Sequence, residues 1–290
     1  MNNIVVGDKC SISISDGISP SLPTKVCFIT AIYGNYESSC KKKVIQTIPT
    51  DYICFTDNEN IISNEWIIDT TPYHITNKSC IDNDNYINSI QNNTHTFNIA
   101  KYYKQSFQNI PILKKYDVII WIDGTVEIIY EKTSEYILNN IYKYKIIGWH
   151  HEGRNGLLLN EVIVSSNCNR YHSEFWYNQV QPFQNVITQY NHYINDGYDE
   201  TFFKKMYSHT PHFGVWVTCF VAFLNNDDNI SNFLNKWYLQ TLQFTTQDQI
   251  SFPYICQKTN IIPFTLPNLD IKGSNPHVKT QLYTRHEHGQ

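Results

Sequence analysis

The chain has 290 residues and a mass of 34.0 kDa, which is enough for the hydrophobic core of one α/β domain or of two small domains. Hydrophobic residues make up 41% of the chain, charged residues make up 17%, and the formal net charge is −4. This composition argues against a disordered chain, and it lacks the positive field that a nucleic-acid partner requires.

The sequence contains no segment that we expect to span a membrane. Its longest apolar stretch, 215–224, is about half as long as a bilayer-crossing helix. Residues 1–18 have neither the basic nor the apolar region of a signal peptide. The eight cysteines form no CxxC pair, and several lie in apolar runs, which favours a reducing compartment. We therefore expect a cytoplasmic protein.

Three parts are expected along the chain. Residues 1–24 are interpreted as an extension, 25–262 as the domain, and 263–290 as a C-terminal segment that closes the site. Short apolar runs, each bounded by polar or glycine-containing turns, predict buried strands of a mostly parallel sheet. These runs are 26–33, 52–55, 117–122, 146–149 and 214–224.

Two segments have the periodicity of amphipathic helices. The clearer one is 231–242, behind Ser231 as N-cap, and the other runs from about 94 to 107. The Asn- and Asp-rich stretch 77–93 is expected to be a surface loop or insertion. Strands that alternate with helices predict an α/β fold, in which ligands bind outside the carboxyl ends of the strands.

The sharpest local pattern is a hydrophobic strand that ends at Asp123, directly before Gly124. This arrangement predicts a carboxylate in the ligand crevice. The chain has neither a P-loop nor a GxGxxG motif to bind phosphates, so a divalent cation on Asp123 is a natural way to hold a diphosphate. The alternative is an Asp that only begins a turn.

Five short motifs occur in the order seen in one glycosyltransferase family. They are KVCFITAIYGNYE at 25–37, YICFTD at 52–57, AKYYK at 100–104, WIDG at 121–124 and QDQISFPY at 247–254. On these motifs the chain resembles the TOD1/MUCI70-like glycosyltransferases between about residues 25 and 258. The resemblance implies a single GT-A-like, Rossmann-type α/β domain with a mostly parallel sheet flanked by helices. It also implies a nucleotide-sugar donor and bound Mn²⁺ or Mg²⁺.

The resemblance assigns the segment after the first strand to the donor. Ala31, Tyr33, Gly34 and Tyr36 would form the wall around the base and ribose, and Asp57 would contact the base or ribose. Glycine at position 34 would let the backbone approach the ligand closely. The alternative interpretation of this stretch is a β-turn after an edge strand.

Two lysines are candidates for binding the donor diphosphate. Lys101 and Lys104 are three residues apart in a predicted helix and therefore share one face. The family has Arg at the position of Lys101, so this chain lacks the bidentate guanidinium there. The alternative is a solvated basic face.

The metal ligands implied by the resemblance are incomplete in sequence. Asp123 and Gly124 belong to the donor motif, and Thr125 stands where the family commonly has Asn. A third ligand is needed, and we interpret His277 as the candidate, with His286 and His288 behind it. The alternative is a C-terminal tail whose histidines bind nothing.

A polar segment follows the fourth predicted strand. The resemblance implies that His151, Arg154 and Glu161 line the donor or acceptor side, with His151 and Glu161 as candidate catalytic residues and Arg154 on the acceptor side. Because His150 and His151 are adjacent at a strand end, at most one of them should face the site. An exposed polar loop is the alternative.

The last motif supplies the candidate general base. Thr246 to Gln249 fits a capping box, which puts Asp248 in the first turn of a helix, where the helix dipole favours a carboxylate. The resemblance assigns Gln247, which replaces an Arg, and Gln249 to the acceptor side. Asp248 would bind an acceptor hydroxyl or remove its proton. An Asp that only stabilises the helix is the alternative.

Together these patterns predict a metal-assisted glycosyltransferase that transfers a sugar, expected from a UDP-sugar, to a glycan or protein hydroxyl. Because Lys101, Thr125 and Gln247 depart from the family pattern, a catalytically idle nucleotide- or glycan-binding module is the alternative. A sugar nucleotidyltransferase is less favoured, because the glycine-rich basic loop is missing. The residue usage is typical of A/T-biased genomes and favours a microbial or viral source, with the host cytoplasm as the location if the source is viral.

Overall fold

A computed structural model describes residues 24–34, 36–73, 96–168, 171, 175–176, 179–180, 185–206, 213–266 and 282–288. The predicted extension up to residue 23, the predicted surface loop at 77–93, and His277 lie outside these ranges. None of the helices in the described ranges has the length and apolar character needed to cross a bilayer.

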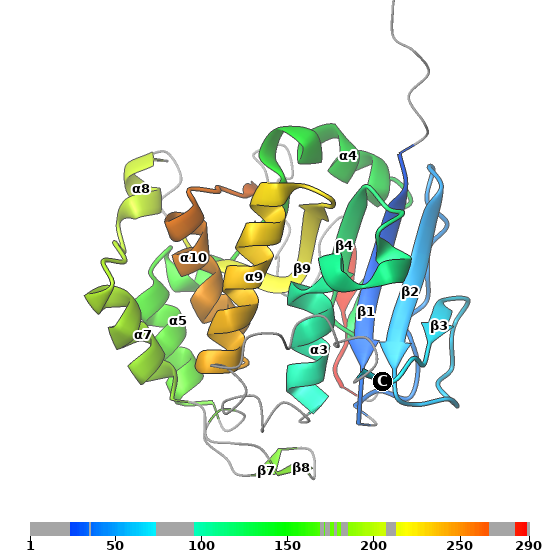
Figure 1. The fold of residues 1–290 in the computed structure, drawn as a ribbon, viewed down its shortest axis with the longest axis horizontal. Helices are drawn as coiled ribbons and strands as arrows, with labels where there is room; N and C mark the ends of the chain where they lie inside the picture. The colour runs from blue at the N-terminus through cyan, green and yellow to red at the C-terminus, as the bar shows by residue number, and fades with distance from the viewer. Residues whose placement is uncertain are drawn as a thin grey trace, which may run out of the picture.

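A seven-stranded sheet forms the centre of the described chain (Figure 1). Its strands, in spatial order, are β10 (Phe264–Leu266), β6 (Ile146–His150), β9 (Trp216–Leu224), β4 (Val118–Ile122), β1 (Val26–Ile32), β2 (Thr50–Thr56) and β3 (Ile67–Asp69). Strand β9 is antiparallel to both neighbours, and the other pairings are parallel. The predicted mostly parallel α/β sheet is confirmed.

Two short ribbons accompany this sheet. Strand β5 (Val126–Ile128) pairs antiparallel with β11 (Tyr283–Arg285), and β7 (Phe175–Trp176) pairs with β8 (Gln179–Val180). Strand β10 extends the main sheet past residue 262, and β11 returns to the segment after β4. Residues beyond 262 therefore contribute to the same fold.

The described helices connect these strands. The α-helices are α3 (Thr96–Gln105), α4 (Thr133–Tyr144), α5 (Leu158–Ser166), α7 (Val186–Asn195), α8 (Phe202–Met206), α9 (Asp228–Gln243) and α10 (Asp248–Thr259). The 3₁₀ turns are η2 (Phe107–Asn109), η3 (Pro111–Leu113) and η4 (Glu152–Arg154). Helices α3 and α9 correspond to the two helices that the sequence predicts.

Helices cover both faces of the sheet. Along β1, Cys27 and Ile29 belong to the core formed with α3, α9 and α10, whereas Val26 and Phe28 belong to the core formed with α4. Helix α3 packs on β1 and α9, and α4 packs on β6, β9 and β10. Strands buried on both faces need apolar side chains at every position, which explains why they appear in sequence as continuous apolar runs.

Two helix starts differ from the sequence prediction. Helix α9 begins at Asp228, because the Asp227 side chain accepts hydrogen bonds from the backbone N–H groups of Asn229 and Ile230. The prediction that Ser231 is the N-cap of this helix was wrong. Helix α10 begins at Asp248 with Gln247 at the N-cap position, one residue later than the predicted capping box. The prediction that Asp248 lies in the first helical turn is confirmed.

The strand directions bring several loops to one edge of the sheet. Strands β1, β2 and β4 are parallel, so their carboxyl ends meet. There the backbone N–H of Gly34 donates to both carboxylate oxygens of Asp57 at 3.1 and 3.2 Å. Because β9 is antiparallel, its amino end lies at the same edge, where Asp123 donates its N–H to the Cys219 carbonyl at 2.9 Å. This edge is where an α/β sheet binds its ligands.

Candidate active site at the carboxyl edge of the sheet

Two lysines of α3 converge on one carboxylate of α10. The Nζ atoms of Lys101 and Lys104 lie 2.8 and 2.6 Å from Oδ2 of Asp248. The spacing of three residues puts both amines on one helical face, and this face packs toward α9 and the sheet. The side chains of Lys104 and Asp248 are 1% and 2% exposed, and that of Lys101 is 13% exposed. Lys101 is thus the lysine of the pair with more access to solvent.

Besides the two lysines, Thr218 and Trp237 also hold Asp248 in place. The Thr218 hydroxyl of β9 donates to its Oδ1 at 2.7 Å, and the Trp237 indole N–H donates to its backbone carbonyl at 3.2 Å. Burial acts to raise the pKa of this carboxyl, but the ammonium groups of Lys101 and Lys104 outweigh burial and hold the pKa well below its ordinary value. Asp248 therefore stays ionised and has little tendency to take up a proton.

Asp123 lies beside this ion cluster and is more open to solvent. Its side chain is 37% exposed, and Lys104 Nζ lies 3.8 Å from its Oδ1. The Trp121 indole N–H donates to the same oxygen at 2.8 Å. Burial acts to raise the pKa of Asp123, and Lys104 and Lys101 lower it by more, so the pKa lies below its ordinary value. Two carboxylates and two ammonium groups together form a compact cluster that is formally neutral.

The rings of two tryptophans enclose the buried ammonium group. Lys104 Nζ lies 5.6 Å from the ring centroid of Trp121 and 5.7 Å from that of Trp237. A cation over an indole face is stabilised by the ring quadrupole. These contacts and the two carboxylates compensate for the removal of Lys104 from water.

A second cluster surrounds Glu161 of α5, which is buried. Its carboxylate accepts hydrogen bonds from Arg154 Nε and from the Ser165 hydroxyl, the latter at 3.0 Å. His151 Nε2 lies 3.8 Å away. Because Glu161 is in the first turn of α5, the helix dipole also favours its negative charge. His151, Arg154 and Glu161 therefore lie together, and their place on the donor or acceptor side stays a prediction.

The glutamines of α10 join the two clusters. Gln247 Nε2 and Gln249 Nε2 donate to Oε1 of Glu161 at 2.7 and 3.0 Å. The side-chain carbonyl of Gln249 accepts from the backbone N–H of Thr218 at 3.4 Å, and Thr218 donates its hydroxyl to Asp248. A continuous polar network therefore runs from α5 through α10 and β9 to α3.

The two histidines at the end of β6 have different partners. His150 Nδ1 lies 3.1 Å from the Leu266 carbonyl of the neighbouring strand β10, whereas His151 is buried beside Glu161. That at most one of the two faces the site stays a prediction.

Some residues of the predicted donor wall lie in the hydrophobic core, and others lie at the edge of the sheet. Tyr33 is buried, stacks on Tyr103 at a centroid distance of 5.6 Å, and donates its hydroxyl proton to Tyr103 at 3.0 Å. Ala31 packs against the same core. Gly34, at φ 66°, donates to Asp57 instead of packing inward. Contact between these residues and a donor stays a prediction.

The described residues provide part of the predicted metal site. Asp123 has an exposed carboxylate, whereas Thr125 is buried and its backbone carbonyl accepts from the His286 N–H at 2.9 Å. Within the described ranges no three His, Cys, Asp or Glu side chains are grouped as metal ligands. A divalent cation ordinarily takes several such ligands, so the described residues do not form a complete site. His277 lies outside the described residues.

The other two C-terminal histidines bind carboxylates. His286 Nε2 lies 2.6 Å from Glu127 Oε2, across the β5–β11 ribbon. His288 Nδ1 lies 3.1 Å from Glu37 Oε1, and its Nε2 lies 2.7 Å from the Tyr36 hydroxyl.

Thr218 and Glu37 are among the residues of the site that were not foreseen in the sequence. Thr218 lies in the middle of an apolar run, and nothing local distinguishes its hydroxyl from that of a core threonine. Glu37 closes the first motif, and its place in that motif is a signal that could have identified it.

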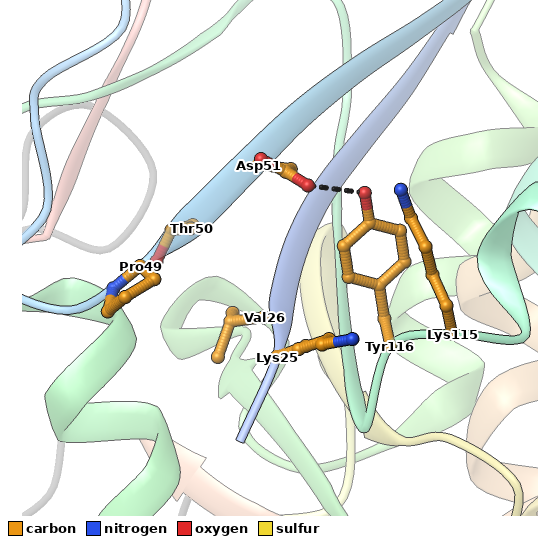
Figure 2. A pocket seen from close by; sticks show the side chains of 7 residues that line it. All are labelled: Lys25, Val26, Pro49, Thr50, Asp51, Lys115 and Tyr116. Atoms are coloured by element: carbon orange, nitrogen blue, oxygen red, sulfur yellow. Dashed lines mark hydrogen bonds between the residues drawn. The ribbon is translucent and has the colours of Figure 1, made fainter. Parts of the chain in front are cut away.

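A pocket of about 250 Å³ lies at the opposite edge of the sheet. It is lined by Lys25, Val26, Pro49, Thr50, Asp51, Lys115 and Tyr116. Figure 2 shows the Tyr116 hydroxyl pointing to Asp51, with the Lys115 side chain beside the ring. These residues lie at the amino ends of β1 and β2, so the pocket is separate from the polar network.

No protein-family model matches the sequence, and no curated protein matches it. The structure is similar to solved glycosyltransferases. One is the apo structure of the bifunctional glycosyltransferase WbbM, with 11% identity and a TM-score of 0.43 over 85% of this chain and 40% of WbbM. This chain thus spans well under half of WbbM.

Two further solved structures are similar in the same way. Mouse xyloside xylosyltransferase 1, in its apo form, has 7% identity and a TM-score of 0.46 over 84% of this chain and 85% of that protein. Core-mannan synthase A from Aspergillus fumigatus, in its Mn/GDP form, has 11% identity and a TM-score of 0.40 over 86% of this chain and 72% of that protein.

Proposed function

We propose that the chain is a GT-A-like glycosyltransferase that transfers a sugar from a nucleoside diphosphate sugar, a UDP-sugar in the first instance, to a hydroxyl of a glycan or protein. One observation carries the proposal. Lys101 and Lys104, Asp123, and Asp248 come from three separate motifs of the sequence. Yet both ammonium groups lie within 3 Å of the Asp248 carboxylate, at 2.8 and 2.6 Å, and that of Lys104 lies 3.8 Å from Asp123. The cluster lies at the edge of the sheet where α/β proteins bind nucleotides.

The cluster offers a diphosphate one accessible cation. Lys101 is partly exposed, and an ammonium group binds phosphate oxygens through charge-assisted hydrogen bonds. Lys104 is buried, and its positive charge adds to the electrostatic potential at the site without any movement of the side chain. In the proposed reaction the bond between the anomeric carbon and the diphosphate oxygen breaks and a bond to the acceptor oxygen forms. The positive groups stabilise the negative charge that develops on the departing diphosphate.

A metal ion is part of the proposal, with its ligand set incomplete. A carboxylate at position 123 repels a diphosphate unless a cation lies between them, and Mn²⁺ or Mg²⁺ would supply such a charge when bound. Of the predicted ligands, Asp123 has the exposed carboxylate. Thr125 and His277 stay as predicted ligands.

The roles of Asp248 and Glu161 follow from their surroundings. We propose that Asp248 positions Lys101 and Lys104, because it is buried between them and its pKa lies far below its ordinary value. Removal of the acceptor proton by Asp248 stays a prediction. Glu161, together with His151 and Arg154, would form the acceptor side, and Gln247 and Gln249 would hold Glu161 in place.

A second candidate function is a nucleotide- or glycan-binding module without activity. The observation that favours it is that Asp248 and Glu161, the two carboxylates expected to move protons, are both buried and held by cations. Donor hydrolysis in the absence of acceptor separates the two functions, since only an enzyme releases UDP from the sugar.

A thermal-shift panel tests the proposed function. UDP-, GDP- and CMP-sugars are added to the protein with Mn²⁺ or with EDTA. A ligand that binds the folded state raises its stability by RT ln(1 + [L]/Kd), so a UDP-sugar with Mn²⁺ should raise the Tm. Asp123→Asn should reduce this rise, whereas Asp199→Asn, which changes an exposed carboxylate paired with Lys205, should leave it intact. Equal rises in EDTA would contradict the metal-assisted form, and no rise with any sugar nucleotide would contradict the function.

A further inference from the structure

One histidine near the chain end contacts two residues of the loop after β1. The Nε2 atom of His288 lies 2.7 Å from the Tyr36 hydroxyl, and its Nδ1 lies 3.1 Å from Glu37 Oε1. The rings of Tyr36 and His288 meet edge to face, with centroids 4.4 Å apart and an interplanar angle of 61°. Residues separated by about the whole domain in sequence therefore form one contact group.

The chemistry of the partners fixes the direction of these hydrogen bonds. Glu37 is buried, and its other oxygen lies 3.5 Å from Lys41 Nζ, so it is a carboxylate that only accepts. Nδ1 of His288 is therefore the donor to Glu37. In the neutral imidazole Nε2 is then the acceptor, and Tyr36 donates to it. In this neutral form, the chain Glu37–His288–Tyr36 orients the Tyr36 hydroxyl toward His288.

The segment that carries His288 is firmly anchored at its start. Strand β11 pairs with β5, and the Tyr283 side chain is buried and stacks on Phe220 at a centroid distance of 5.4 Å. The backbone N–H of His286 donates to the Thr125 carbonyl at 2.9 Å. The segment is thereby attached to the residues that directly follow Asp123.

The two regions that the C-terminal segment contacts, the loop after β1 and the turn after β4, meet at Gly124. A Cβ atom at this glycine would lie 3.2 Å from Ile32 Cγ1 and 3.6 Å from Glu37 Cγ. The end of β1 and the loop that follows it thus contact the turn after β4, through Ile32 and Glu37. His288 holds Glu37 from the side of the C-terminal segment.

We infer that His288 is a positioning residue of the donor site, which holds Tyr36 and Glu37 against the Asp123–Gly124 turn so that the two loops form one wall for the nucleoside. This inference rests on the proposed function. A loop fixed before binding does not lose conformational freedom when the ligand arrives, and affinity rises accordingly. The ligand class is a nucleoside diphosphate, and the effect is on its nucleoside part.

Calorimetric titrations with UDP and with uridine test this role. His288→Ala and Tyr36→Phe should each weaken UDP by about fivefold to tenfold, the range of one lost hydrogen bond. The double variant should be no weaker than either single variant, because both changes remove the same contact. His288→Gln keeps one donor and one acceptor and should restore most of the affinity. Glu287→Ala, an exposed neighbour, should bind as the wild type does.

The comparison of ligands separates positioning from general stability. His288→Ala should weaken uridine by the same factor as UDP and leave the Tm within about 2 °C of the wild type. If wild type binds UDP and His288→Ala binds it equally well, the inference is overturned and the proposed function stands. If His288→Ala and Glu287→Ala weaken UDP equally, the segment acts as a whole and the inference is also overturned. If wild type binds no nucleoside diphosphate, the proposed function itself fails.

Discussion

Lys104 and Asp248 form an ion pair, with Nζ 2.6 Å from Oδ2, in which both side chains are almost completely buried. Taking two charges out of water costs several kcal/mol each unless close partners compensate. Here the compensation comes from Lys101 and Asp123 together with the Thr218 hydroxyl. The pair is therefore both the main electrostatic feature of the site and a stability risk when one member is removed.

Lys104→Met should destabilise the fold by about 3–5 kcal/mol, because Asp248 then lies buried with half of its cationic partners. Urea unfolding followed by circular dichroism measures the change. The matched control is Lys205→Met, which removes an exposed pair with Asp199 and should cost less than about 1 kcal/mol. Equal losses in both variants would contradict a special role for the buried pair.

The stability contributed by Asp248 should depend on pH in a defined direction. Its pKa is lower in the folded state than in the unfolded state, so its contribution is fully present above the unfolded value, about 4, and is lost as the pH falls through the folded pKa. The difference in unfolding free energy between wild type and Asp248→Asn should be constant from pH 5 to 7 and shrink below about pH 4. A constant difference down to pH 2 would show that ionisation of Asp248 is not what stabilises the fold.

Lys101→Ala should weaken UDP by about tenfold, as expected for one charge-assisted hydrogen bond to phosphate, and leave uridine affinity unchanged. Lys101→Arg keeps the charge and should retain the affinity for UDP. Calorimetry with the two ligands gives both numbers. Equal weakening of UDP and uridine by Lys101→Ala would assign Lys101 to the structure of α3 and not to the diphosphate.

Gln247→Glu should destabilise the fold by about 2 kcal/mol or more, because it puts a second carboxylate against buried Glu161. In the present structure the Gln247 amide donates to Glu161 Oε1 at 2.7 Å and to the Ser165 hydroxyl at 3.0 Å. The control is Gln243→Glu at an exposed position near the end of α9, where the change should be within about 0.5 kcal/mol. The Tm of each variant checks the prediction, and a neutral Gln247→Glu would contradict the hydrogen-bonded environment of Glu161.

The main strands could be predicted because both faces of the sheet are covered. Runs such as 26–33 and 117–122 are apolar at nearly every position, and such a run can be recognised in the sequence without knowledge of the neighbouring strands. The three-residue strands β3, β5, β10 and β11 are too short to show a periodic pattern, so they were not foreseen. The antiparallel direction of β9 depends on the connections around it and has no signal in its own residues.

The sequence predicts which residues belong to the candidate site. It predicts much less about the burial and the partners of those residues. The spacing of Lys101 and Lys104 placed them on one face, and the Asp123 turn placed a carboxylate at the sheet edge. The burial of Asp248 between both lysines arises from the packing of α3 against α9 and α10 against β9, which no local pattern encodes. The general-base role expected for Asp248 rested on its place in the first turn of a helix, and that place does not reveal that the residue is buried.

The central claim is that a nucleoside diphosphate binds at the carboxyl edge of the sheet, beside Asp123 and Lys101. A titration of ¹⁵N-labelled protein with UDP, followed by TROSY amide spectra, tests it most directly. The account predicts that the amide signals of Gly34 and Gly124 shift with one saturation curve, while those of Thr50 and Lys115, at the pocket on the opposite edge, stay in place. Shifts confined to Thr50 and Lys115, or no shifts at all at saturating UDP, would contradict it.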